Sequence, residues 1–152
     1  MTILGVDIGS KIIGIAVSDE NNFIALPLCS IKRDEFSSKI KDIIMDYKIT
    51  EIVAGLPLSL NHLNTDGFAV GKTMDNAAEL FKNIELPVHF QDERFTSVSA
   101  FKALSFDTHK PSKKSKSRVK EKKKLLNIDT LSATYILQTY LDLKKRKEED
   151  ED

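Results

Sequence analysis

Three carboxylates stand at positions where a carboxylate is unusual. Asp7 lies inside an apolar run, Glu93 follows another short apolar run, and Asp129 falls in the first turn of a predicted helix. Each has an ordinary explanation: Asp7 can cap a turn, Glu93 can pair with Arg94 or lie in solvent, and Asp129 favours a helix N-terminus. If the fold brings all three together, they repel one another unless a divalent cation lies among them.

Magnesium in proteins is bound by a few carboxylates together with water and the phosphate oxygens of a substrate. Two such ions, about 3.5–4 Å apart, activate a water molecule and stabilise the leaving oxygen when a phosphodiester bond is cleaved. We therefore predict that Asp7, Glu93 and Asp129 are both metal ligands and catalytic residues, with one or two Mg²⁺ or Mn²⁺ ions as the cofactor.

Asp7 belongs to a predicted β-hairpin over residues 3–19. Its two strands, residues 3–8 and 12–18, are joined by the turn sequence Gly-Ser-Lys. Strand alternation puts Ile3, Gly5 and Asp7 on one face and Leu4, Val6 and Ile8 on the other. A carboxylate inside a buried strand costs several kcal/mol unless something compensates it.

The rest of the chain alternates predicted strands and helices. We expect a third strand at 23–31, at a sheet edge or with a bulge because it contains Pro27. A helix capped by Asp34 should then run to about Tyr47. Further strands are predicted at 49–56 and 86–91, and further helices at 68–83, from 96 or 97 to 104, and at 128–143.

The connections between these elements predict the fold class. Short connections make the first three strands antiparallel, and helical crossovers make the next two parallel. The expected fold class is therefore α/β, with a mixed five-stranded sheet and helices on both faces.

Length and composition indicate one domain over residues 1–143, with a mobile basic loop at 105–124 and a charged tail at 144–152. No apolar run is long enough for a transmembrane helix. The single cysteine, Cys29, fits a reducing cytoplasm. Every apolar stripe has a place in one core, so we expect a monomer or a weak homodimer.

Charge is distributed unevenly along the chain. Residues 1–109 hold 10 Lys or Arg against 15 Asp or Glu, a net charge of −5, whereas residues 110–124 hold 9 against 1, a net charge of +8. Such a basic arm is typical of phosphate contact with nucleic acid, although a solubilising loop is the simpler alternative. The predicted nucleic-acid contacts are Lys11, Arg94, Lys113, Lys114, Lys116, Arg118, Lys120, Lys122, Lys123 and Lys124.

Four segments together resemble the YqgF-type family, whose members are described as Holliday junction resolvases and as pre-16S rRNA nucleases. The segments are LGVDIGSKIIGIAVSD, VAGLPLSLN, DERFTSVSA and IDTLSATYILQTYLD. The resemblance implies a ribonuclease H-like fold and a metal-dependent nuclease with its acids at Asp7, Glu93 and Asp129. It also implies the 5′ leader of precursor 16S rRNA as substrate, in ribosome biogenesis, with branched DNA and a role in recombination as the alternative.

This sequence departs from the family pattern in three places. Ile12 replaces a basic residue after Lys11, His62 replaces a glycine of the GLPL loop, and Ser132 replaces the first alanine of an Ala-Ala pair. None of these positions is a predicted metal ligand. The departure at Ile12 affects the expected contact with the nucleic-acid backbone, and the departure at His62 affects the expected shape of the loop.

Two other functions compete with a nuclease. The Asp7-Ile8-Gly9-Ser10 turn also resembles the phosphate-binding hairpin of actin-like ATPases and sugar kinases, but those need two related domains around a nucleotide and 152 residues supply one. A non-catalytic RNA- or DNA-binding module would keep the basic arm and use the three acids structurally.

Overall fold

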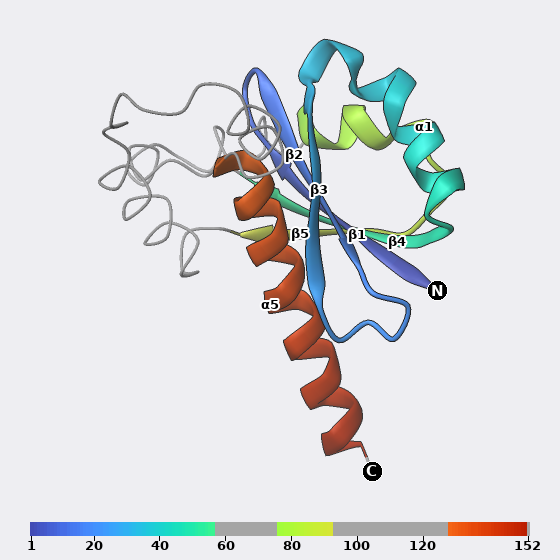
Figure 1. Cartoon of the computed structure of the whole chain (residues 1–152), viewed down its shortest axis with the longest axis vertical. Helices are drawn as coiled ribbons and strands as arrows, with labels where there is room; N and C mark the ends of the chain where they lie inside the picture. The colour runs from blue at the N-terminus through green and yellow to red at the C-terminus, as the bar shows by residue number, and fades with distance from the viewer. Residues whose placement is uncertain (57–75, 93–127, 152) are drawn as a thin grey trace, which may run out of the picture.

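Strand β1 is the centre of the sheet, and every other element is placed relative to it. The computed structural model describes residues 1–56, 76–92 and 128–151. The sheet has five strands in the order β3-β2-β1-β4-β5 (Figure 1). The strands are β1 Thr2–Ile8, β2 Ile12–Ser18, β3 Ala25–Lys32, β4 Ile49–Leu56 and β5 Val88–Asp92.

The strand directions confirm the predicted mixed sheet. β1 pairs antiparallel with β2 and β2 antiparallel with β3, whereas β4 runs parallel to β1 and β5 parallel to β4. β3 is an edge strand, and its register shifts where Ile15 pairs with Cys29 but Ala16 pairs with Pro27. The edge position and bulge expected from Pro27 are therefore both present, because proline cannot donate to a regular ladder.

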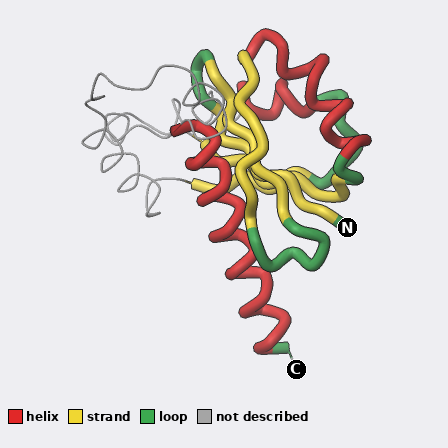
Figure 2. Tube along the Cα trace, in the orientation of Figure 1, coloured by secondary structure: helices red, strands yellow, loops and turns green. Residues whose placement is uncertain are grey.

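Helices cover both faces of the sheet (Figures 1 and 2). Helix α1, Phe36–Asp46, and the helical residues 76–81 lie on one face, and helix α5, Ile128–Asp150, lies on the other. The alternation predicted for β1 is correct: Leu4, Val6 and Ile8 belong to the core on the α1 side, and Ile3 belongs to the core under α5. In the described residues no helix is long and apolar enough to cross a membrane.

Two helix ends differ from the sequence prediction. Asp34 does not cap α1, because the chain leaves β3 through a 3-10 turn, η1 (Arg33–Glu35). Glu35 occupies the N-cap, and its side chain makes no capping hydrogen bond but accepts from Lys39 Nζ at 2.8 Å. α5 continues to Asp150 rather than ending near residue 143. Its last turns are held by good helix formers and by an ion pair of 4.0 Å between Lys145 Nζ and Glu149 Oε1, four residues apart.

A polar cluster fixes the middle of α5 to the sheet. The Tyr140 hydroxyl donates to Glu51 Oε1, and Lys144 Nζ donates to Glu51 Oε2 at 3.0 Å. His89 Nε2 lies 3.2 Å from Glu51 Oε1, and its ring stacks on Tyr140 with the centroids 5.5 Å apart. Burial raises the pKa of Glu51, but the bonds from Tyr140 and Lys144 outweigh burial and hold that pKa below its usual value. Burial and the Glu51 carboxylate raise the pKa of Tyr140.

We predict that Glu51→Gln lowers the free energy of unfolding by about 1 kcal/mol at neutral pH, because the charge-assisted bond to Lys144 is lost. The pKa of Glu51 is lower in the folded than in the unfolded chain, so its stabilisation is present above about pH 4.5 and is lost as the pH falls through the folded value. Urea denaturation across this range should show the wild-type and variant curves converging at low pH.

Glu79→Gln is the matched control, because Glu79 is exposed and, among the described residues, pairs only with Lys82, three residues further along the chain. Its effect should stay within about 0.5 kcal/mol. A difference between wild type and Glu51→Gln that persists unchanged at low pH would contradict the assignment of the charge to Glu51.

Candidate functional site

Asp7 is a buried carboxylate near the carboxyl end of the central strand. Its exposed fraction is 2%. Its partner in the register is Gly14 on β2 and Gly55 on β4, so the directly paired residue on each side has no side chain. The two residues paired with Asp7 in the sheet therefore contribute no side chains beside this carboxylate.

The first turn of α5 packs against the backbone of Gly14. A Cβ placed on Gly14 would lie 1.9 Å from the carbonyl oxygen of Asp129 and 2.9 Å from the Thr130 nitrogen. Because Gly14 pairs with Asp7, this contact brings the start of α5 over the position beside the Asp7 carboxylate. Asp129 is half-buried there. Two of the three predicted acids thus come from opposite ends of the chain to one part of the molecule.

Small residues allow α5 to lie equally close along β1. A Cβ on Gly5 would lie 2.7 Å from Leu137 Cβ and 2.9 Å from the Ala133 carbonyl oxygen. Ser132 and Ala133 are fully buried, and Ser132 Oγ donates to the Ile128 carbonyl oxygen at 2.8 Å. The Ser132-Ala133 pair therefore packs against the sheet while its one polar atom is satisfied inside the helix.

The third acid, Glu93, lies outside the described residues, as do Arg94, the loop at residues 57–66 and the basic arm at 110–124. β5 ends at Asp92, which pairs with Leu56 at the same edge of the sheet where β1 and β4 end. Within the described part of the chain, no three His, Cys, Asp or Glu side chains gather as a metal site. Asp7 and Asp129 nevertheless offer oxygen donors of the kind that Mg²⁺ and Mn²⁺ prefer.

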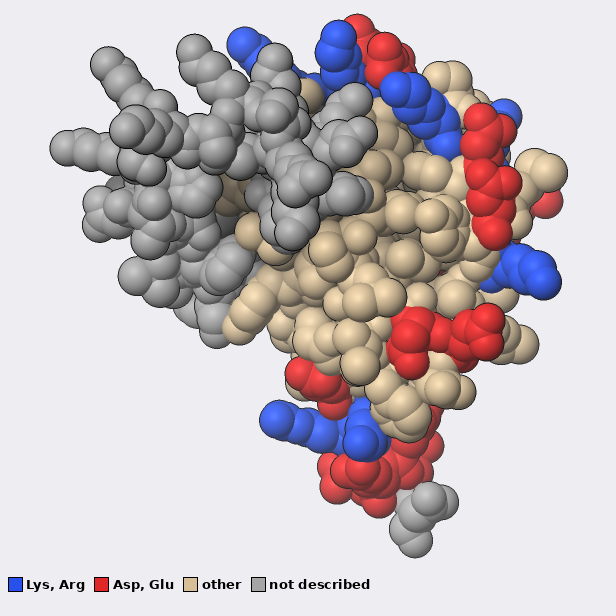
Figure 3. Space-filling model, in the orientation of Figure 1, with Lys and Arg blue, Asp and Glu red and all other residues tan. Residues whose placement is uncertain are grey.

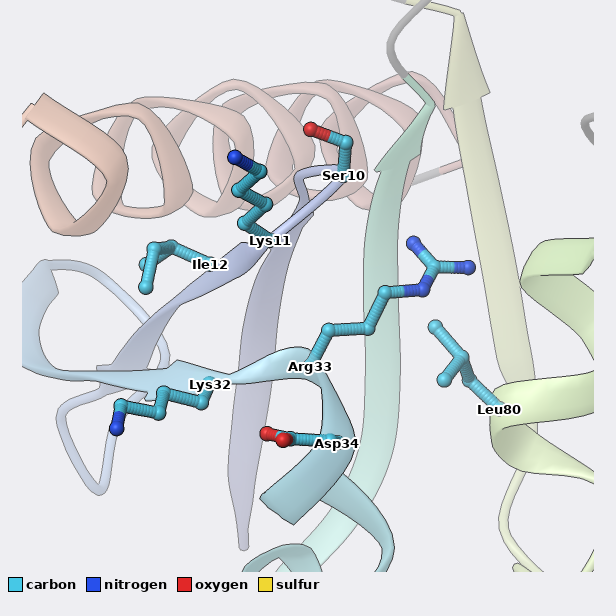
Figure 4. A pocket seen from close by; sticks show the side chains of 7 residues that line it. All are labelled: Ser10, Lys11, Ile12, Lys32, Arg33, Asp34 and Leu80. Atoms are coloured by element: carbon cyan, nitrogen blue, oxygen red, sulfur yellow. The ribbon is translucent and has the colours of Figure 1, made fainter.

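Lys11 is exposed in the hairpin turn, beside a pocket of about 610 Å³ (Figure 4). Lys32 and Arg33, at the end of β3 and the start of η1, line the same pocket. Sequence reasoning missed both, although a pair of adjacent basic residues at the end of a strand in an otherwise acidic segment was a usable signal.

Comparison with known proteins identifies the family. The family model described as "RuvX: Holliday junction resolvase" matches residues 1–143. The chain belongs to the RuvX family. A Sulfurihydrogenibium protein is 45% identical over 143 residues, covering 92% of this chain and 89% of the relative. A Clostridium acetobutylicum protein is 37% identical over 146 residues, covering 93% and 98%. Both carry the name "Putative pre-16S rRNA nuclease".

Solved structures with the same fold include other nucleases. Thermus thermophilus RuvC in complex with a Holliday junction substrate superposes with a TM-score of 0.52 at 10% identity, covering 95% of this chain and 96% of that one. The fowlpox virus Holliday junction resolvase gives 0.50 at 18% identity, covering 94% and 99%. At these identities the likeness concerns the fold alone, and it confirms the ribonuclease H-like fold expected for this RuvX chain.

We predict that Gly14→Ala lowers the free energy of unfolding by about 1–3 kcal/mol, because its Cβ would overlap the Asp129 backbone and force α5 away from β2. Gly14→Ser adds one more atom and should cost more. Urea denaturation measures both. Stability equal to that of the wild type would show that α5 does not pack against Gly14.

Proposed function

We propose that this RuvX protein is a metal-dependent nuclease that hydrolyses phosphodiester bonds during 5′-end processing of precursor 16S rRNA. The observation that carries the proposal is Asp7, buried between two glycines, with the start of α5 packed against one of them. A carboxylate in such a place is costly unless an ion or a hydrogen-bond donor compensates it. The relatives named for pre-16S rRNA processing support the choice of substrate.

In this proposal Asp7, Glu93 and Asp129 hold one or two Mg²⁺ or Mn²⁺ ions. A bound ion of this kind lowers the pKa of a water molecule and offsets the charge on the leaving oxygen. Asp7 is held rigidly by hydrogen-bonded strands on both sides, and Asp129 by the contact of α5 with Gly14. Gly14, beside Asp7, lets the start of α5 pack directly on β2 and so brings Asp129 to the same part of the sheet as Asp7.

Nucleic acid would be captured by cationic side chains around the acids. Lys11 in the hairpin turn holds a phosphate, Arg94 orients Glu93 or contacts the backbone, and the arm at 110–124 supplies a net charge of +8. Contacts of this kind position a nucleic acid and do not read its sequence. The protein would act in the cytoplasm as a monomer or a weak homodimer.

Cleavage of Holliday junctions or other branched DNA is the second candidate. The description of the matching family favours it. A resolvase that cuts a four-way junction symmetrically needs two active sites related by a twofold axis. This candidate therefore differs from the first in substrate and in assembly, and it uses the same three acids.

We predict metal-dependent cleavage of a 5′-extended 16S rRNA precursor, with Mg²⁺ or Mn²⁺ active and EDTA inactive. Asp7→Asn and Asp129→Asn should abolish it, because each removes a negatively charged ligand. Asp46→Asn is the control, since Asp46 is exposed at the end of α1, on the opposite face of the sheet. A four-way DNA junction is tested in parallel.

The outcomes of this assay separate the candidates. Cutting of the RNA that Asp7→Asn abolishes supports precursor processing, and cutting of the junction alone supports the resolvase. If neither is cut while binding survives in EDTA, the protein is a binding module and the metal-dependent mechanism is wrong.

We also predict that Mn²⁺ stabilises the folded wild-type protein but not Asp7→Asn. A ligand at 100 times its dissociation constant adds about 2.7 kcal/mol to the free energy of unfolding. Denaturation with Mn²⁺ and with EDTA measures this gain for the wild type, Asp7→Asn and Asp46→Asn. An equal gain in all three would place the ion elsewhere.

A further inference from the structure

The hairpin end also carries a pocket that contains none of the three predicted metal ligands. The pocket of about 610 Å³ is lined by Ser10, Lys11, Ile12, Lys32, Arg33, Asp34 and Leu80. Leu80 packs against the core on the α1 side, whereas Asp7 faces α5. Ile12 and Lys32 pair with each other and alternate with Ile13 and Ile31 of that core, so the pocket lining spans both sides of the hairpin end.

Hydrogen bonds between Arg33 and the hairpin turn hold the pocket in place. The Arg33 backbone N–H donates to the Lys11 carbonyl oxygen at 2.9 Å. Arg33 Nη1 donates to the Gly9 carbonyl oxygen at 2.9 Å, which ties the guanidinium to the hairpin turn. The half-buried Arg33 thus fixes the end of β3 against the residues that follow Asp7.

The lining is cationic. It holds three basic side chains, Lys11, Lys32 and Arg33, against one carboxylate, Asp34, so its net charge is +2. Lys11 and Lys32 are exposed, and neither forms an ion pair with any described residue. On the face shown in Figure 3, basic side chains lie along the rim where β3 leads into η1 and α1, with acidic ones beside them.

The directions of the side chains indicate the shape of the ligand. In Figure 4 the cationic ends of Lys11, Lys32 and Arg33 fan out and do not converge on one point, and Leu80 adds an apolar wall beside Arg33. A compact anion such as free phosphate is best held by converging donors. A polymer with a phosphate on each unit and apolar surface between the phosphates fits the separated cationic groups and the apolar Leu80 side chain better.

We propose that this pocket binds the sugar-phosphate backbone of the RNA strand at a nucleotide beyond the cleaved bond, with Lys32 as a phosphate contact. The proposal rests on the proposed function and extends its binding surface. Gly9 follows Asp7 by two residues, about 7 Å of extended chain. A strand that enters at Asp7 therefore reaches the pocket within a few nucleotides by passing over the hairpin tip.

The test measures binding without cleavage. Asp7→Asn is the non-cleaving background and EDTA is present throughout, so the result does not depend on whether the protein proves to be a nuclease. The probes are a labelled single-stranded RNA copied from the 5′ end of the precursor and a labelled four-way DNA junction. Fluorescence anisotropy gives the affinity at several salt concentrations, and thermal unfolding confirms that each variant is folded.

Lys32→Gln should reduce the slope of log affinity against log salt for the RNA by about 0.7, the value of one phosphate contact on a single strand. Lys32→Arg should keep the wild-type slope because it keeps the charge. Lys41→Gln is the matched control, an exposed lysine of α1 outside the pocket, and it should leave the slope unchanged.

Three results would overturn the proposal. The first is equal slopes for Lys32→Gln and Lys41→Gln on RNA. The second is a change in slope with the junction alone. The third comes from backbone NMR: if inorganic phosphate shifts the amide resonances of Lys32 and Arg33 as strongly as the RNA does, the pocket is a site for small anions.

Discussion

The close approach of α5 to the β1–β2 hairpin is the constraint on which the rest of the site depends. Gly5 and Gly14 permit it, since a Cβ at either position would overlap the helix at 2.7 Å or less. A helix normally packs on a sheet through side chains, at about 10 Å. Here the backbone of Asp129 packs against the backbone of β2 at Gly14, so the start of α5 is placed by direct backbone contact rather than by flexible side chains.

That constraint also gives Asp7 its setting. The strand places the carboxylate at the centre of the sheet, and the glycines in register with it keep side chains away on both sides. A tightly packed sheet would be more stable with an apolar residue at position 7, because burial of a carboxylate is unfavourable. An acid at this position is therefore expected to serve the proposed function rather than the stability of the fold.

Local sequence patterns predicted the parts of the fold that local chemistry decides. Alternation in residues 3–8 assigned the two faces of β1, and Pro27 predicted an edge strand with a bulge.

The same reasoning failed where contacts between distant parts of the chain decide the local structure. Asp34 looked like a helix cap, yet Arg33 is bonded to the hairpin and the chain tightens into a 3-10 turn before α1 begins. α5 continues beyond its apolar pattern, where Lys144 bonds to Glu51 of β4 and Lys145 pairs with Glu149. The position of Gly55 beside Asp7 could not be predicted, because it depends on how β1 pairs with β4, and neither strand's own sequence specifies that register.

The charge distribution explains why cationic sites should flank the acids. Residues 1–109 carry a net charge of −5, so the body of the protein repels a polyanion at long range. Charge of the opposite sign is concentrated in the sequence of the arm at 110–124, with a smaller amount in the pocket at the hairpin end. Cationic side chains of this kind would hold a nucleic-acid strand against the long-range repulsion of the acidic body. The scissile phosphate would then approach the acids only where divalent ions have reversed the local charge, which makes productive binding depend on the same ions as the chemistry.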